Sequence, residues 1–267
     1  MPLSRAEIGA YQKANQHART LIRTRLAAYV KGSWEGLGSW RDADVNRWVA
    51  ATAPRVAESQ KLVANLTATY LGKRLSSTAV DTIDTSALRG VDPTEVYRRP
   101  AKTLYRELSL GKSFGAALSA STARALDIAA TDVQLAMTSQ ASASMQAGGV
   151  QFYQRVLVGP EDCALCMIAS TQHYRTGDLM PIHPGCNCDV EPLDSSTGRF
   201  EAMDGSYRVI DPVRLENTHN MVKNLVGSTD RGGRSPDYRK LISVREHGEI
   251  GPTLTFRHQG FTGPEDL

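Results

Sequence analysis

A chain of 267 residues with a formal net charge of +3 is long enough to bury a hydrophobic core as one large or two moderate domains. No apolar run approaches the roughly 20 residues that a membrane-spanning helix needs, and residues 1–30 carry charges throughout without the apolar stretch of a signal peptide. We therefore expect neither a membrane protein nor an exported one. Aromatic residues make up only 6% of the chain, whereas alanine, serine and arginine are plentiful, which favours a mainly α fold.

Residues 1–149 are expected to form a helical domain. In its first segment, apolar residues recur at steps of three and four, which predicts an amphipathic helix. These residues are Ile8, Tyr11, Ala18, Leu21, Ile22 and Tyr29. The glycine-rich segment 32–40 should end this helix and place Trp34 and Trp40 in an exposed loop, where they could anchor a partner protein.

Proline and glycine divide the rest of this half. Pro54 should kink the second helix or start a new one, because proline lacks the backbone N–H of the helical hydrogen bond. Asp92–Pro93 predicts a helix start, with a capping aspartate and a proline in the first turn. The segment 113–145 is the clearest predicted helix, and Gly148–Gly149 should close it.

Charge is divided unevenly along the chain. Residues 1–150 hold 19 lysines and arginines against 12 acidic residues, and residues 151–267 hold 12 against 16. A basic helical half could contact DNA phosphates, which attract cations without sequence specificity. An ordinary solvated surface explains the same modest excess.

Residues 150–194 are expected to form a small β unit. Phe152–Val158 is rich in β-branched and aromatic residues and predicts a strand. Thr176–Asp178 should form the turn that brings the chain back. Beyond this turn, Cys186 and Cys188 alternate as in a strand, which would direct both sulfurs to one side.

The same unit holds every cysteine of the chain. Cys163 and Cys166 form a C-x₂-C pair, whose tight turn could direct both sulfurs at one metal, and the run His183-Pro-Gly-Cys186-Asn-Cys188 follows. Thiolate and imidazole are ligands that Zn²⁺ prefers, and a structural zinc site takes four of them in a tetrahedron. The pattern predicts one structural zinc ion, bound mainly by the four cysteines, with His183 as an alternative ligand.

Other interpretations of these residues stay open. Five candidate ligands compete for four positions, so one of His183, Cys186 and Cys188 should be spare, and His183 could instead hydrogen-bond a ligand thiolate and orient it. Two disulfides are the second interpretation, which an exported chain would favour. Reduced, buried thiols without a metal are the third.

Residues 195–267 should contain short helices, a linker and an extended tail. A helix is expected over 212–226, a flexible linker over 227–235 and a last helix over 235–243. One strand is expected at 253–257. Together, these signals predict a mainly α fold with an N-terminal helical body, a small zinc-knuckle β unit and an extended C-terminal arm.

The sequence lacks the usual signatures of an enzyme. It contains no His-Glu-x-x-His, no Gly-x-Ser-x-Gly and no phosphate-binding glycine loop. A thiolate-rich ligand set is typical of a closed structural site. Four further histidines are isolated and are expected to be surface or hydrogen-bonded residues: His173, His219, His247 and His258. We therefore expect no enzymatic activity, and a metal-dependent nuclease is the rival interpretation.

Several runs in the second half form a recognisable pattern. They are Arg155–Val158, Cys163–Ser170, Tyr174, Asp178–His183, Cys186–Cys188 and Val190–Pro192. This pattern resembles the head-morphogenesis family of tailed bacteriophages, also called Mu F-like minor head or minor capsid proteins. Residues 245–255 and 260–267 resemble the versions carried by phages of actinobacteria, whereas residues 1–150 match no motif of the family.

What this resemblance implies is a minor structural protein of a bacteriophage head, incorporated near the portal vertex during procapsid assembly. It implies the portal protein and other head proteins as partners, with non-specific contact to packaged DNA as an option, and no membrane. The protein would lie in the head of the virion, and in the host cytoplasm during assembly. A metal-dependent nuclease or a DNA-binding internal head protein is the alternative function.

Overall fold

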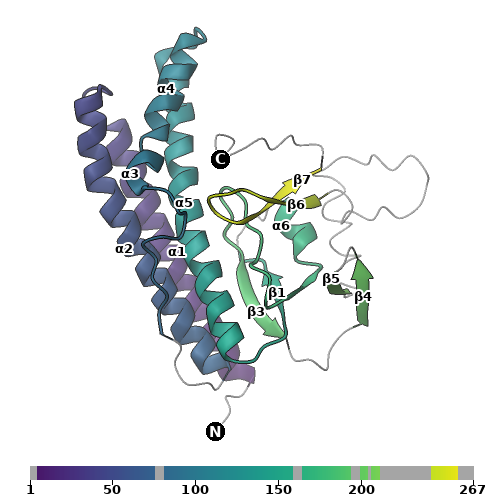
Figure 1. Cartoon of the computed structure of the whole chain (residues 1–267). Helices are drawn as coiled ribbons and strands as arrows, with labels where there is room; N and C mark the ends of the chain where they lie inside the picture. Colours follow the sequence, from purple (N-terminus) through teal and green to yellow (C-terminus); the bar gives the residue numbers. More distant parts are fainter. Residues whose placement is uncertain are drawn as a thin grey trace.

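The computed structural model describes residues 5–75, 81–158, 164–193, 199–203, 206–210 and 242–257. The predicted mainly α class is confirmed: long helices form one side of the molecule, and short strands lie beside them (Figure 1). The helices are α1 (Arg5–Glu35), α2 (Asp42–Arg74), α3 (Pro93–Val96), α4 (Arg99–Ser109), α5 (Phe114–Ala147) and α6 (Ala164–Ala169). None of the helices in these ranges is long and apolar enough to cross a membrane.

Three long helices, α1, α2 and α5, run side by side and form the helical body (Figure 1). Leu26, Val30 and Trp34 of α1 recur every four residues and are buried, so they form one apolar stripe facing the other helices. The predicted first helix is therefore observed, but its buried stripe is not the predicted one: Tyr11 and Leu21 are exposed, and Ile22 and Tyr29 are only half-buried.

α2 runs through Pro54 without interruption, so the expectation that this proline starts a new helix is wrong. Val49 and Val56, on either side of the proline, are buried in the same hydrophobic core. Most of the stability of a helix within a protein comes from such packing, which here outweighs the local cost of one missing hydrogen bond.

The expectation that Trp34 lies in an exposed loop is also wrong. α1 extends past this residue, and its side chain is 0% exposed. The indole Nε1 donates a hydrogen bond to Ser121 Oγ at 2.9 Å, and the ring packs edge-on against Trp48 with 4.7 Å between centroids. Trp40 does lie between α1 and α2, half-buried against Phe114.

The predicted helix ends are confirmed by capping contacts. Asp92 caps α3 by accepting a hydrogen bond from Thr94 N at 2.7 Å. Ser113 caps α5 by accepting one from Ala116 N at 3.3 Å. Beyond the other end of α5, Gly149 adopts a φ of +68°, the left-handed conformation common at helix C-termini.

A three-stranded antiparallel sheet forms the centre of the β unit. Its strands are β1 (Phe152–Val156), β2 (His173–Arg175) and β3 (Asp189–Leu193), in the order β2-β1-β3. The strand predicted from residue 152 is confirmed, and the predicted turn at 176–178 follows β2. β1 is the central strand, and its alternation buries Tyr153 and Arg155.

Two hairpins complete the described chain. Their strands are β4 (Arg199–Met203) with β5 (Ser206–Ile210), and β6 (Ile242–Glu246) with β7 (Pro252–Phe256). β7 confirms the strand predicted at 253–257. The helix predicted over 235–243 is wrong where the structure describes it, because Ile242 and Ser243 belong to β6. The helix expected over 212–226 and the linker expected over 227–235 lie outside the described residues.

The hairpin of β6 and β7 packs against α6, so residues 242–257 do not form the extended arm that was expected. Ile242 and Leu254 of the hairpin are buried against Ile168 and Ala169 of α6. Burial of these aliphatic side chains favours the packed hairpin over a solvated arm.

One hydrophobic core continues from the helical body into the β unit. The same cluster of buried residues contains Ala125 and Val133 of α5, Tyr153 of β1 and the buried cysteines. The boundary at residue 149, and with it the division into 1–149, 150–194 and 195–267, stays a prediction. The packing nevertheless gives the first two parts a shared core.

Ion pairs also join the two halves of the chain. Each pair below links an arginine of the basic half to a carboxylate of the acidic half. They are Arg19–Asp189 at 2.6 Å, Arg74–Glu191 at 2.7 Å, Arg89–Glu249 at 3.3 Å and Arg99–Glu249 at 3.0 Å. The uneven division of charge along the sequence is thus partly balanced inside the molecule.

Candidate metal centre

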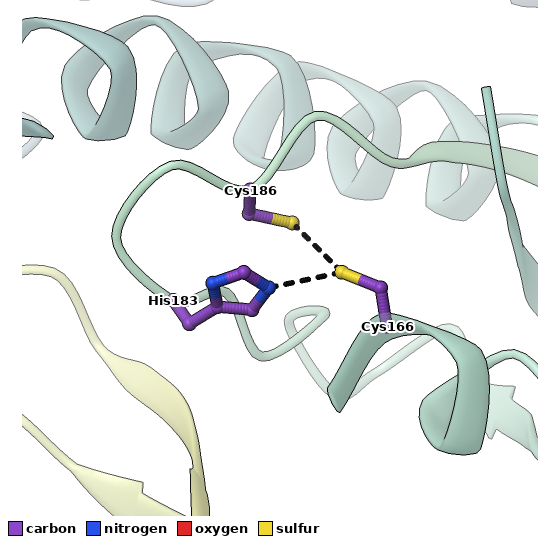
Figure 2. A group of neighbouring side chains, drawn as sticks. All are labelled: Cys166, His183 and Cys186. Carbon is purple, nitrogen blue, oxygen red and sulfur yellow. Dashed lines mark hydrogen bonds between the residues drawn. The ribbon is translucent and has the colours of Figure 1, made fainter. Parts of the chain in front are cut away.

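Three of the predicted ligands, Cys166, His183 and Cys186, come together in the β unit (Figure 2). The Cys166 sulfur lies 2.9 Å from His183 Nε2 and 3.8 Å from the Cys186 sulfur. All three residues are buried, and every pair of their ligand atoms lies within 4.8 Å. Because thiolate and imidazole are common metal ligands, this cluster can bind a metal ion.

Cys166 lies on α6, so the tight turn expected between the two cysteines of the C-x₂-C pair is replaced by a short helix at Ala164–Ala169. The helix directs Cys166 toward Cys186 and His183 (Figure 2). Cys163, the first cysteine of the pair, lies outside the described residues.

His183 and Cys186 share one turn, which hydrogen bonds hold in place. Cys186 N donates to His183 O at 3.0 Å, and Gly185 between them adopts a φ of +71° that most other residues would find strained. Just before the turn, Ile182 forms a parallel bridge with Thr253 of β7. The hairpin of β6 and β7 therefore helps to position the second group of ligands.

The ring of His183 is oriented as a metal ligand requires. Its Nδ1 lies 2.7 Å from the carbonyl oxygen of Pro184. Because a carbonyl oxygen only accepts, Nδ1 carries the proton, and Nε2 keeps its lone pair directed at the Cys166 sulfur. This pairing of one ring nitrogen with a backbone carbonyl is typical of histidines that bind metals.

Cys188 is buried beside the compact group, and its thiol interacts with those of Cys166 and Cys186. It precedes β3, so the expectation that Cys186 and Cys188 lie on a strand is wrong. Both cysteines are nonetheless buried while Asn187 between them is only half-buried, as the alternation predicted. The carbonyl oxygen of Cys188 accepts a hydrogen bond from Gln134 Nε2 of α5 at 2.8 Å, which ties this segment to the helical body.

Arg155 is a residue of this site that the sequence analysis did not assign to it. It lies on the central strand β1 and is 0% exposed. Its Nη1 lies 3.3 Å from the Cys186 sulfur and 3.9 Å from the Cys166 sulfur, and its Nη2 donates to the Pro181 carbonyl oxygen. The signal that could have revealed it is an arginine that shares a face of the predicted strand with Tyr153.

The cysteines differ in their readiness to lose a proton. Hydrogen bonds with Cys166 and Cys188, helped by the charge of Arg155, hold the pKa of the Cys186 thiol well below its ordinary range, although burial opposes this. For Cys188, the hydrogen bond with Cys166 lowers the pKa, but the bond with Cys186 and burial together raise it to about 12. Cys186 is therefore better prepared than Cys188 to act as a thiolate ligand.

The spacing of the two sulfurs fits a tetrahedral centre. Two thiolates bound to one Zn²⁺ at about 2.3 Å, with a tetrahedral angle between them, would lie about 3.8 Å apart. Cys166 and Cys186 already have this separation. The contact between Cys166 and His183 at 2.9 Å would have to lengthen by roughly half an ångström, which a small side-chain rotation supplies.

The other histidines lie apart from this cluster or outside the described chain. His173 and His247 are buried, and His247 Nδ1 accepts a hydrogen bond from Glu249 N at 3.4 Å. His219 and His258 are not among the described residues.

The fold and the cluster together define a mainly helical protein with a buried cysteine and histidine centre that can hold a metal ion. Comparisons with protein-family models, with curated proteins and with solved structures gave no match.

Proposed function

We propose that this protein is a non-enzymatic assembly protein in which a structural Zn²⁺ joins the β unit to the helical body. The burial of Cys166, His183 and Cys186 in one compact group is the observation that carries this proposal. Zn²⁺ suits a set of thiolates and one imidazole, and the fourth ligand would be Cys163 or Cys188. A centre closed in this way serves folding rather than chemistry.

The position of the centre supports a role in joining parts of the fold. Its ligands come from α6 and from the turn before β3, two separate elements of the β unit. The turn continues into Cys188, which Gln134 of α5 holds by a hydrogen bond. A metal that fixes the turn would therefore also fix the contact between the β unit and α5.

We expect one equivalent of zinc per chain. Elemental analysis of the reduced, folded protein, with counts of free thiols before and after removal of the metal, measures this. Zinc far below one equivalent in a folded sample would contradict the proposal. Cysteines that stay unreactive in metal-free protein prepared without a reductant would instead support the disulfide interpretation.

For the biological role, we propose a minor structural protein of a bacteriophage head, incorporated near the portal vertex during procapsid assembly. The support is the resemblance of residues 151–267 to the phage head-morphogenesis family. The arrangement of charge favours a protein partner over DNA. Arg19, Arg74, Arg89 and Arg99 of the basic half are already engaged by acidic residues of the same chain, which reduces the charge available for phosphates.

We expect the full chain to copurify with the portal protein encoded beside its own gene, with little change between 50 and 200 mM salt. A protein interface anchored by apolar contacts changes little with salt. A protein making six to ten phosphate contacts would lose about 10³–10⁵ in DNA affinity over the same range. The measurement is retention of the full chain on immobilised portal protein and on duplex DNA at both salt concentrations. Steeply salt-dependent retention on DNA, with none on the portal protein, would contradict this role and favour the DNA-binding alternative.

A further inference from the structure

The charge of Arg155 requires an explanation, because the residue is wholly buried on a central strand. Burying an ionised side chain costs several kcal/mol unless opposite charge and hydrogen bonds compensate it. Two of the contacts that the guanidinium makes are with sulfurs, those of Cys186 and Cys166. The positive charge of Arg155 therefore lies next to the cysteine sulfurs that would bind the metal.

The charge of the metal centre provides the compensation. A divalent ion with three thiolates and one imidazole carries one net negative charge, since imidazole binds as a neutral ligand. Such a centre, buried beside Arg155, would leave the pair close to neutral. The attraction between the negative metal centre and the Arg155 cation then offsets the free-energy cost of burying each of them.

The geometry of the guanidinium also fixes where its charge acts. Nη2 donates to the Pro181 carbonyl oxygen, which anchors one end of the planar group. Nη1 is thereby directed between the two sulfurs, at 3.3 Å from Cys186 and 3.9 Å from Cys166. Pro181 belongs to the segment that leads into His183, so the same side chain connects β1 to the ligand turn.

We propose that Arg155 is a positioning residue of the metal centre, whose guanidinium hydrogen-bonds the ligand sulfurs, offsets their negative charge and thereby sets the affinity for the metal. This inference rests on the proposed structural metal site. Groups that hydrogen-bond metal ligands typically change metal affinity by about 10–100-fold when they are replaced.

The test uses the full chain with Co²⁺ in place of Zn²⁺, because Co²⁺ bound to thiolates has a visible spectrum with sulfur-to-metal charge-transfer bands. Arg155→Met removes the charge and the N–H donors but keeps an apolar side chain of similar length. We expect its affinity to fall by about 10–100-fold. The charge-transfer bands should move to lower energy, because the sulfurs lose their hydrogen bonds. Arg155→Lys keeps the positive charge but not the planar set of N–H donors. Its metal affinity and band energies should lie between those of the wild type and the methionine variant.

The outcomes separate the two hypotheses. A wild-type chain that binds neither Co²⁺ nor Zn²⁺ would overturn the structural metal site itself. A wild-type chain that binds Co²⁺, with an Arg155→Met variant of equal affinity and unchanged spectrum, would overturn only the role of Arg155.

A second comparison keeps the inference testable if Arg155→Met alone fails to fold. In metal-free protein, Cys186→Ala leaves the buried cation without one of its sulfur contacts, whereas the double variant with Arg155→Met removes both partners. We expect the double variant to be at least as stable to urea as Cys186→Ala alone, because replacing a buried charged pair costs less than breaking it. A double variant less stable to urea than Cys186→Ala alone would contradict the inference.

Discussion

Replacing Cys166 by serine should release the metal and destabilise the β unit, while α1, α2 and α5 stay formed. Cys166 lies at the centre of the compact group, within 3.8 Å of the Cys186 sulfur and 2.9 Å of His183 Nε2. With zinc at a thousand times its dissociation constant, binding to the native state contributes about 4 kcal/mol to stability, and the variant would lose this contribution. The measurement is urea unfolding together with hydrogen exchange at β1, β3 and α6.

The wild-type chain provides the control for this prediction. A chelator should lower its stability by a similar amount, and added zinc, but not magnesium, should restore it, because a thiolate-rich site binds Mg²⁺ poorly. Neither treatment should change the Cys166→Ser variant. Equal protection of the β unit in the variant and the wild type would contradict the prediction. Loss of the long helices in the variant would show that the shared core folds only as a whole.

Asp132→Asn is expected to cost about 3–5 kcal/mol of unfolding free energy, as removal of one partner from a buried ion pair does. Asp132 lies on α5 and accepts hydrogen bonds from Arg89 Nε and, at 2.6 Å, from the hydroxyl of Tyr97. Burial, together with the charge of Asp132, raises the pKa of Tyr97 well above its ordinary value, so the phenol remains a donor. The asparagine variant would leave the Arg89 cation buried with less negative charge around it.

Asp44→Asn is the matched control, because it makes the same chemical change in a pair with the largely exposed Arg47. Exposed ion pairs contribute about 0–1 kcal/mol, so this variant should unfold at nearly the wild-type urea concentration. Both variants are compared by urea unfolding, with the slope of free energy against denaturant checked for two-state behaviour. Similar losses at the two positions would show that burial does not determine the strength of these pairs.

The local signals of the sequence predicted the helical part of the fold well. The helical character of α1, the cap at Asp92, the start of α5 after Ser113 and the glycine after α5 depend on residues within one or two turns of one another. Such interactions are visible in a sequence without knowledge of the tertiary structure. The strands β1 and β7 were predictable for a similar reason, since β-branched and aromatic residues are concentrated there.

The errors fall where distant parts of the chain meet. Trp34 lies next to a glycine-rich segment, and only the packing of Trp48 and Ser121 around it determines that it is buried. Residues 242–246 form a strand because β7 pairs with them and α6 covers them. These tertiary contacts outweigh the local propensity of the residues. They involve partners outside any short stretch of sequence, so the sequence analysis could not include them.

For the metal centre, the sequence by itself determined that a thiolate-rich site was to be expected, because all four cysteines and His183 fall in one short segment. Only the tertiary structure decided which of them meet: α6 and the turn at Gly185 bring Cys166, Cys186 and His183 together, with Cys188 beside them. Only the tertiary structure places Arg155 beside the cysteine sulfurs. It also brings arginines of the basic half into ion pairs with carboxylates of the acidic half. The physical reason is that metal ligation and ion pairing depend on distances of a few ångströms between residues that are not neighbours in the chain, and folding around a shared core sets those distances.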